Sequence, residues 1–144
     1  MAFLSPRRFC NAYEVLVVLL LAVYVEARVR RVPLPRLAAR LGVRLAVTES
    51  APEPSFSLEN RDVRRLKAVA WVFMHWPDAD SCLRRALVAG CRLRHLDPRL
   101  HLGVRRDARG RVEAHAWLEV QGHVWDPEAG TYGRLSNGSG PTSR

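Results

Sequence analysis

Hydrophobic residues recur at helical spacing over the first two thirds of the chain. The longest apolar run, Val15–Val25, predicts one helix and is bracketed by Glu14 and Glu26. A second helix is expected between Ser57, which can cap its N-terminus, and Pro77, which ends it. The residues that define the buried face of this second helix are Val63, Leu66, Ala70 and Phe73.

A third helix is expected to begin at Cys82, with Asp80 or Ser81 as its N-cap residue. The residues that form its apolar stripe are Leu83, Ala86, Leu87, Gly90 and Cys91. Cys82 lies at the edge of this stripe. At a helix start, unpaired N–H groups and the helix dipole favour an anionic thiolate.

In the last third of the chain, apolar and polar residues alternate as they do in β-strands. Three strands are expected, at His101–Arg106, Val112–Val120 and His123–Asp126. In the middle strand, valine, alanine and leucine alternate with glutamate, histidine and tryptophan, a pattern typical of a strand with one face in the core. The turns between the strands are Asp107–Gly110 and Gln121-Gly122. The expected fold is α+β, an antiparallel meander packed against helices.

The two-residue turn places a histidine and an aspartate on one face of the sheet. It pairs Val120 with His123, which puts Asp126 diagonal to His115. Diagonal neighbours lie about 7–8 Å apart at the backbone, a gap that these two side chains can close with a hydrogen bond. Together with Cys82, they are the parts of a thiol nucleophile with an oriented base.

Each of these residues also has an ordinary structural interpretation. Cys82 could be a small buried hydrophobe, which is the interpretation we adopt for Cys91 and Cys10. His115 could be a half-buried strand residue, and Asp126 could simply begin a turn.

A zinc site is the second alternative. Cys91 and His95 are spaced to share one helix face, and His101 or His123 could complete a set of ligands. The spacing matches no recognised zinc motif, so the preferred hypothesis includes no metal.

The chain is strongly basic, with a net charge of +9 over 144 residues. Arginines are scattered from Arg7 to Arg144 without interleaved aromatic residues, which argues against a nucleic-acid surface. Arg84 and Arg85, next to the thiol, could support a thiolate or hold an acidic substrate residue, but ordinary solvent exposure is the preferred interpretation. Three cysteines without a Cys-x-x-Cys motif favour a reducing compartment, here the cytoplasm.

The chain divides into three parts at its Pro- and Gly-rich segments. An N-terminal helical subdomain is expected over residues 1–50, a core over 58–130 and a flexible tail over 131–144, with a linker at Thr48–Ser57. Within the first part, Val32-Pro-Leu-Pro-Arg36 ends the first helix, and Arg36–Leu41 is a short amphipathic turn stopped by Gly42.

The Val15–Val25 run is too short for a membrane span. Eleven residues of helix cover about 16 Å, whereas the hydrocarbon core is about 30 Å thick. Glu14 interrupts the pattern of a signal peptide. The helix is expected to be buried on most sides or docked on a partner, and peripheral membrane contact remains an alternative.

Three motifs resemble a known family. Cys82-Leu-Arg-Arg-Ala-Leu, Leu100-His-Leu-Gly-Val104 and Ala114-His-Ala-Trp-Leu-Glu119 are similar to segments of transglutaminase-like cysteine peptidases, and more narrowly of the leader peptidase of lasso-peptide biosynthesis. The resemblance covers roughly residues 58–130. It implies a papain-like core in which the nucleophile helix packs on an antiparallel sheet.

The same resemblance implies a function and a set of partners. The catalytic triad would be Cys82, His115 and Asp126, with no cofactor in the bond cleavage. Residues 1–57 show no strand ladder that a leader peptide could join, as in the split form of the family. The implied partners are the precursor peptide, a separate leader-recognition protein and the lasso cyclase. A transglutaminase-like acyl transferase and a non-catalytic adaptor of the same fold are the alternative functions.

Overall fold

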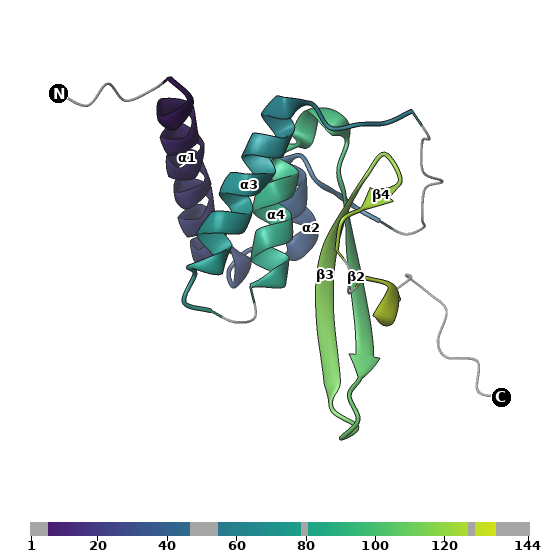
Figure 1. The fold of residues 1–144 in the computed structure, drawn as a ribbon. Helices are drawn as coiled ribbons and strands as arrows, with labels where there is room; N and C mark the ends of the chain where they lie inside the picture. Colours follow the sequence, from purple (N-terminus) through teal and green to yellow (C-terminus); the bar gives the residue numbers. More distant parts are fainter. Residues whose placement is uncertain (1–5, 47–54, 79–80, 127–128, 135–144) are drawn as a thin grey trace.

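Helices form one layer of the molecule and a mixed β-sheet forms the other (Figure 1). The computed structural model describes residues 6–46, 55–78, 81–126 and 129–134. The α-helices in this part are α1 (Pro6–Val29), α2 (Leu34–Leu41), α3 (Asn60–Met74) and α4 (Cys82–Arg92). Two short 3₁₀ helices follow, η1 (Arg94–Leu96) and η2 (Ala129–Thr131).

The sheet consists of a long hairpin with shorter strands beside it. Strands β2 (Arg99–Arg106) and β3 (Val112–Val120) pair antiparallel along their full length, and β4 (His123–Val124) continues the meander. The expected meander is therefore confirmed, although the third strand ends two residues early. The sheet is mixed, because β1 (Arg44–Leu45) pairs parallel with β2. The fifth strand, β5 (Gly133–Arg134), pairs with β2.

Helix α1 is more than twice as long as the apolar run that predicted it. It spans 24 residues, because Pro6 and the polar residues after it continue the same helix. Only one face is buried, the one that carries Val18, Ala22 and Val25. The expectation of burial on most sides is therefore wrong, since Leu20 and Val23 are 64% and 60% exposed. None of the helices in the described ranges has the length and hydrophobicity needed to span a bilayer.

Two carboxylates fix α1 against α4. Glu14, at the start of the apolar run, pairs with Arg92 at the last turn of α4. Glu26, at the end of the run, pairs with Arg84 in the first turn of α4. Arg84 is only 9% exposed, so its expected exposure to solvent is wrong. The two helices therefore run antiparallel.

The core joins the N-terminal helices to the rest of the molecule. Buried residues of α1 and α2 belong to the same hydrophobic cluster as those of α3, α4 and the sheet. The linker expected at Thr48–Ser57 lies mostly outside the described residues, as does the tail beyond residue 134. The boundary between subdomains therefore stays a prediction.

Several local expectations differ from the structure. Helix α2 begins at Leu34 rather than Arg36, since Pro33 and Pro35 are both tolerated in a first helical turn. Helix α3 is preceded by Glu59 as its N-cap residue, and Ser57 does not cap it. Its buried face is rotated from the predicted one. The residues buried on α3 are Asp62, Ala68, Val69, Val72 and Phe73, whereas Ala70 is exposed.

Candidate active site

The hairpin between β3 and β4 brings His115 and Asp126 together. Gln121 and Gly122 both have positive φ, as a type I′ turn requires, and Val120 pairs with His123 in the expected register. His115 Nε2 lies 2.7 Å from Asp126 Oδ2. The side chains are 10% and 15% exposed, so water competes little for this hydrogen bond.

Cys82 is the first residue of α4, preceded by Ser81 as the N-cap residue. Its thiol is free and half-buried. In the described part of the chain, no hydrogen bond joins the thiol to His115. The predicted position at a helix start is confirmed. Asp80, the other predicted cap, lies outside the described residues.

The first turn of α4 lies beside the histidine and aspartate. Arg85, three residues after Cys82, places a guanidinium nitrogen 3.8 Å from Asp126 Oδ2. Ala86 and Asp126 also line the same cavity of about 310 Å³, to which Trp117 and Trp125 contribute. Arg85 is 48% exposed, so it adds positive charge at the rim of the site rather than a buried ion pair.

Hydrogen bonding determines which nitrogen of His115 can accept a proton. Nε2 faces Asp126, and a neutral imidazole bound to a carboxylate donates its proton there. Nδ1 is then the basic nitrogen that can accept a proton from a nucleophile. The arrangement places an oriented imidazole near the first turn of the helix that begins at Cys82.

Two aromatic rings stack on the His115 imidazole. Tyr132 stacks on it with ring centroids 4.8 Å apart, and Trp117 stacks at 6.0 Å. Arg105 lies over the Tyr132 ring at 4.4 Å, and its side chain also bonds Glu113. Sequence reasoning placed Tyr132 in a flexible tail. Residues 131–134 instead lie against the sheet, because β5 pairs with β2.

Gly103 makes room for this stack. It lies opposite His115 in the β2–β3 ladder. A Cβ at this position would lie 2.7 Å from Trp117 Cζ3 and 2.8 Å from Tyr132 Cβ, closer than carbon atoms pack. An isolated glycine inside a strand pattern marks such a close approach, and this signal was present in the sequence.

Trp117 also contacts a buried histidine. His101 stacks on the indole with ring centroids 5.6 Å apart, and its Nε2 lies 2.6 Å from Glu119 Oε2. His101, Trp117 and Glu119 are each 3% exposed or less. The simple alternation predicted for β3 is therefore wrong in both halves of the strand. Val112 and Ala114, predicted to face the core, are exposed, and both faces of the second half are buried.

The residues proposed for the alternative zinc site do not come together. His95 Nε2 lies 3.3 Å from Asp62 Oδ2, and His101 is engaged with Glu119. Over the described ranges, no three metal-ligating side chains gather at one point. Cys91 is half-buried against the core, and this burial raises the pKa of its thiol, with Arg94 and Arg92 acting in the opposite direction. Cys91 thus has the character of a structural cysteine.

Comparison with known proteins matches most of the chain to a family model. A sequence model of the transglutaminase-like superfamily matches residues 19–136, a range that includes Cys82, His115 and Asp126. None of the curated proteins and none of the solved structures gives a significant match.

Proposed function

Because the chain belongs to the transglutaminase-like superfamily, whose members are typically cysteine peptidases or transferases, we propose that it is a cysteine peptidase. Its proposed substrate is the precursor of a lasso peptide, from which it removes the leader. The observation that supports this proposal best is the His115–Asp126 hydrogen bond beside the helix that begins at Cys82. The resemblance of three sequence motifs to lasso leader peptidases is the basis for the proposed substrate.

In the proposed reaction, His115 Nδ1 accepts the proton of the Cys82 thiol. The thiolate attacks the carbonyl carbon of the peptide bond between leader and core. The resulting oxyanion can accept a hydrogen bond from backbone N–H groups at the start of α4, where the helix leaves them unpaired. His115 then donates its proton to the leaving amine of the core peptide, and the leader remains on Cys82 as a thioester.

Water completes the cycle. His115 accepts a proton from a water molecule, and the resulting hydroxide attacks the thioester carbon. The C–S bond breaks, the leader leaves with a free carboxylate, and the Cys82 thiolate takes the proton back from His115. Asp126 holds the proton on Nε2 throughout, so Nδ1 stays available for both steps. The chain's own residues supply every proton transfer, and no cofactor is needed.

The proposal includes three partners: the precursor peptide, a separate leader-recognition protein and the lasso cyclase. A leader that binds by strand addition needs an exposed strand edge of several residues. Among the described residues before α3, the elements are α1, α2 and β1, and β1 has only two residues. The resemblance to the split form of the family is the basis for proposing a separate leader-recognition protein. The free thiols of Cys82 and Cys91 support a reducing compartment, the cytoplasm.

The test is incubation of the purified chain with the precursor, with and without the leader-recognition protein, followed by mass spectrometry. The expected products are the intact leader with a new carboxyl terminus and the core peptide with a new amino terminus. A precursor that stays intact in the presence of the recognition protein would refute the proposal.

An acyl transferase remains the second candidate, because the same thioester can react with an amine instead of water. The addition of a primary amine distinguishes the two. A transferase would give a leader whose mass is increased by the amine, whereas a peptidase gives the free acid. A non-catalytic adaptor of the same fold would give neither product.

A further inference from the structure

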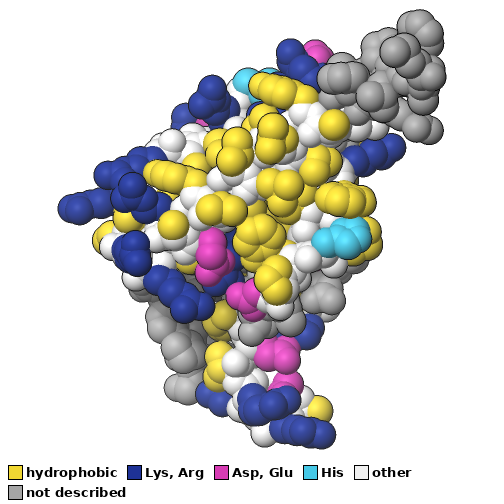
Figure 2. All heavy atoms as spheres, turned by 90° about the vertical axis from the view of Figure 1, so that its left-hand side faces the viewer, with side chains coloured by type: hydrophobic (Ala, Val, Ile, Leu, Met, Phe, Trp, Pro, Cys, Tyr) yellow, Lys and Arg dark blue, Asp and Glu magenta, His cyan; other side chains and the backbone are white. Residues whose placement is uncertain are grey.

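The outer face of α1 is apolar along most of the helix. Side chains spaced three or four residues apart project to solvent, and Tyr13, Leu16, Leu20 and Val23 are each more than half exposed. Figure 2 faces this side of the molecule and shows hydrophobic side chains gathered over its middle, with arginine and lysine at the margins. We call these four residues the α1 stripe. Contiguous apolar surface of this kind marks an interaction site.

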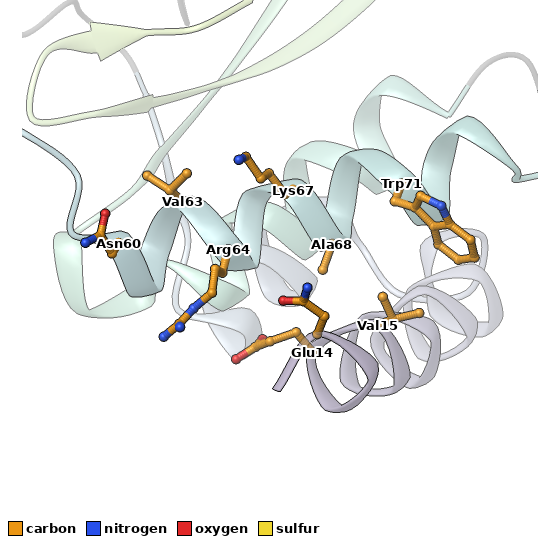
Figure 3. A pocket seen from close by; sticks show the side chains of 9 residues that line it. Glu14, Val15, Asn60, Val63, Arg64, Lys67, Ala68 and Trp71 are labelled. Atoms are coloured by element: carbon orange, nitrogen blue, oxygen red, sulfur yellow. The ribbon is translucent and has the colours of Figure 1, made fainter. Parts of the chain in front are cut away.

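A groove lies between α1 and α3, and it includes Val15, the sequence neighbour of Leu16 in the stripe. It has a volume of about 650 Å³, and its walls include Val15 of α1 and Trp71 of α3. Figure 3 shows Val15 facing α3, with Trp71 at one end of the groove and Arg64 toward the other. Trp71 is half exposed, so a bulky aromatic ring is available to a ligand in the groove.

The groove carries excess positive charge. Arg64 and Lys67 line it, both are exposed, and within the described residues neither forms an ion pair. The one carboxylate in the lining, Glu14, is already paired with Arg92 and also faces Arg65. Other arginines on α3 and α4 have carboxylate partners within the chain. The cations of the groove are therefore available to acidic side chains from outside.

The stripe also has a defined direction relative to the active site. Its Tyr13 end lies near Glu14, which pairs with Arg92 at the end of α4. Its Val23 end lies near Glu26, which pairs with Arg84, two residues after Cys82. A protein docked along the stripe would thus extend toward the end of α4 at which the nucleophile lies.

We propose that the α1 stripe and the adjoining groove bind an amphipathic helix of a partner protein. That helix would place apolar side chains on the stripe and on Trp71, and carboxylates next to Arg64 and Lys67. Helix-in-groove recognition combines these two features. The concave shape favours a protein segment over a membrane, because a lipid surface is flat and leaves a groove unfilled. The proposed function makes this partner the leader-recognition protein, and the choice of probe below rests on it.

The experiment measures binding of the full-length chain to the leader-recognition protein by isothermal titration calorimetry. Two variants alter the surface, Leu20→Glu in the stripe and Lys67→Glu in the groove. Glutamate forms helix well, so each variant should melt like the wild type. The matched controls are Val112→Glu, an equally exposed apolar residue on the hairpin, and Arg40→Glu, an exposed cation on α2.

We expect each surface variant to raise the Kd about tenfold or more and each control to leave it unchanged. The contribution of the Lys67 charge to this affinity should also decrease as salt is added. Precursor cleavage is measured separately on the same proteins. If the two surface variants weakened binding but the wild type did not cleave the precursor, the proposed peptidase would be refuted and the docking surface supported. If the wild type cleaved the precursor and both surface variants bound with the wild-type Kd, the docking surface would be refuted and the peptidase supported.

Two other occupants are tested in parallel. Flotation with vesicles of phosphatidylcholine and phosphatidylglycerol tests a membrane, and sedimentation velocity tests self-association. If Leu20→Glu abolished vesicle binding or dimer formation while the Kd for the leader-recognition protein stayed at the wild-type value, the proposal would be wrong. Absence of any binding between the wild-type chain and that protein would overturn it as well.

Discussion

Replacing Gly103 with alanine should disturb the candidate active site through the rings that stack on His115. The new Cβ would lie 2.7 Å and 2.8 Å from two atoms of the Trp117 ring, and 2.8 Å from Tyr132 Cβ. Carbon atoms prefer separations of about 3.5–4.0 Å, so each ring must move by roughly 1 Å. Both rings stack on the imidazole, and a shift of this size at a catalytic group can lower a rate about 100-fold.

The same overlap should lower stability. Overpacking in a filled core costs about 1–3 kcal/mol, which corresponds to a fall in Tm of roughly 3–12 °C for a chain of this size. The matched control is Gly130→Ala, where no atom lies within 4 Å of the added Cβ. The Tm is measured by circular dichroism and the rate by single-turnover cleavage of the precursor.

The outcomes of this experiment separate two explanations. If Gly103→Ala matched the wild type in Tm and rate, the conclusion that the Trp117 and Tyr132 side chains lie this close to Gly103 would be wrong. If only the Tm fell, the ring stack would be part of the core but would not position His115. Loss of rate in Gly130→Ala as well would mean that the assay reports something other than the contact at Gly103.

Three further changes test other parts of the account. Asp126→Asn should fold normally and cleave roughly three to four orders of magnitude more slowly in single-turnover assays, because an amide favours the wrong imidazole tautomer; near-wild-type cleavage would remove Asp126 from the triad. Cys91→Ala should keep full activity and cost about 1–2 kcal/mol in urea denaturation at neutral pH. Burial raises the pKa of Cys91 above that of the thiol in the unfolded chain. The contribution of Cys91 to the free energy of unfolding is therefore present below the ordinary thiol pKa, and it is lost as the pH rises through the raised value. The deficit of Cys91→Ala should therefore shrink at alkaline pH, and a constant deficit would contradict this. His101→Ala should cost about 1–3 kcal/mol, because it removes a hydrogen-bond partner from a carboxylate that is 2% exposed, and an unchanged Tm would be inconsistent with the buried pair.

Local patterns were sufficient to predict the hairpin that forms the site. Strand β3 has the predicted ends, and the Gln121-Gly122 turn sets the predicted register. Since the side-chain period of a strand is two, that register alone determines that Asp126 and His115 share a face. The start of α4 at Cys82 also followed from local residues, because the preceding polar segment and the apolar stripe define a helix boundary.

Features that depend on distant segments could not be predicted in this way. Tyr132 reaches His115 because β5 pairs with β2, and a two-residue strand in a Gly- and Ser-rich segment leaves no periodic signal. Arg84 is buried because Glu26 and Asp78 meet it from other elements. Hydrophobic periodicity reports the polarity of a position and not the identity of an ion-pair partner.

The exposed face of α1 shows a different limit. The apolar run predicted a buried helix, yet Leu20 and Val23 face solvent in the isolated chain. Apolar residues in a sequence indicate surface that is unfavourable in water, but they do not indicate whether the same chain or another molecule covers it. The run therefore predicted apolar surface, and the structure was needed to show which face of the helix this chain covers.

The central claim is that Cys82, His115 and Asp126 act as one catalytic unit, and the two cysteines of α4 test it most directly. The measurement is single-turnover cleavage of the precursor by Cys82→Ala and Cys91→Ala, with the leader-recognition protein at saturation and with Tm values recorded in parallel. Cys82→Ala should melt near the wild-type temperature and show no cleavage, whereas Cys91→Ala should melt lower and cleave at the wild-type rate. Cleavage by Cys82→Ala, or an inactive and well-folded Cys91→Ala, would contradict the account.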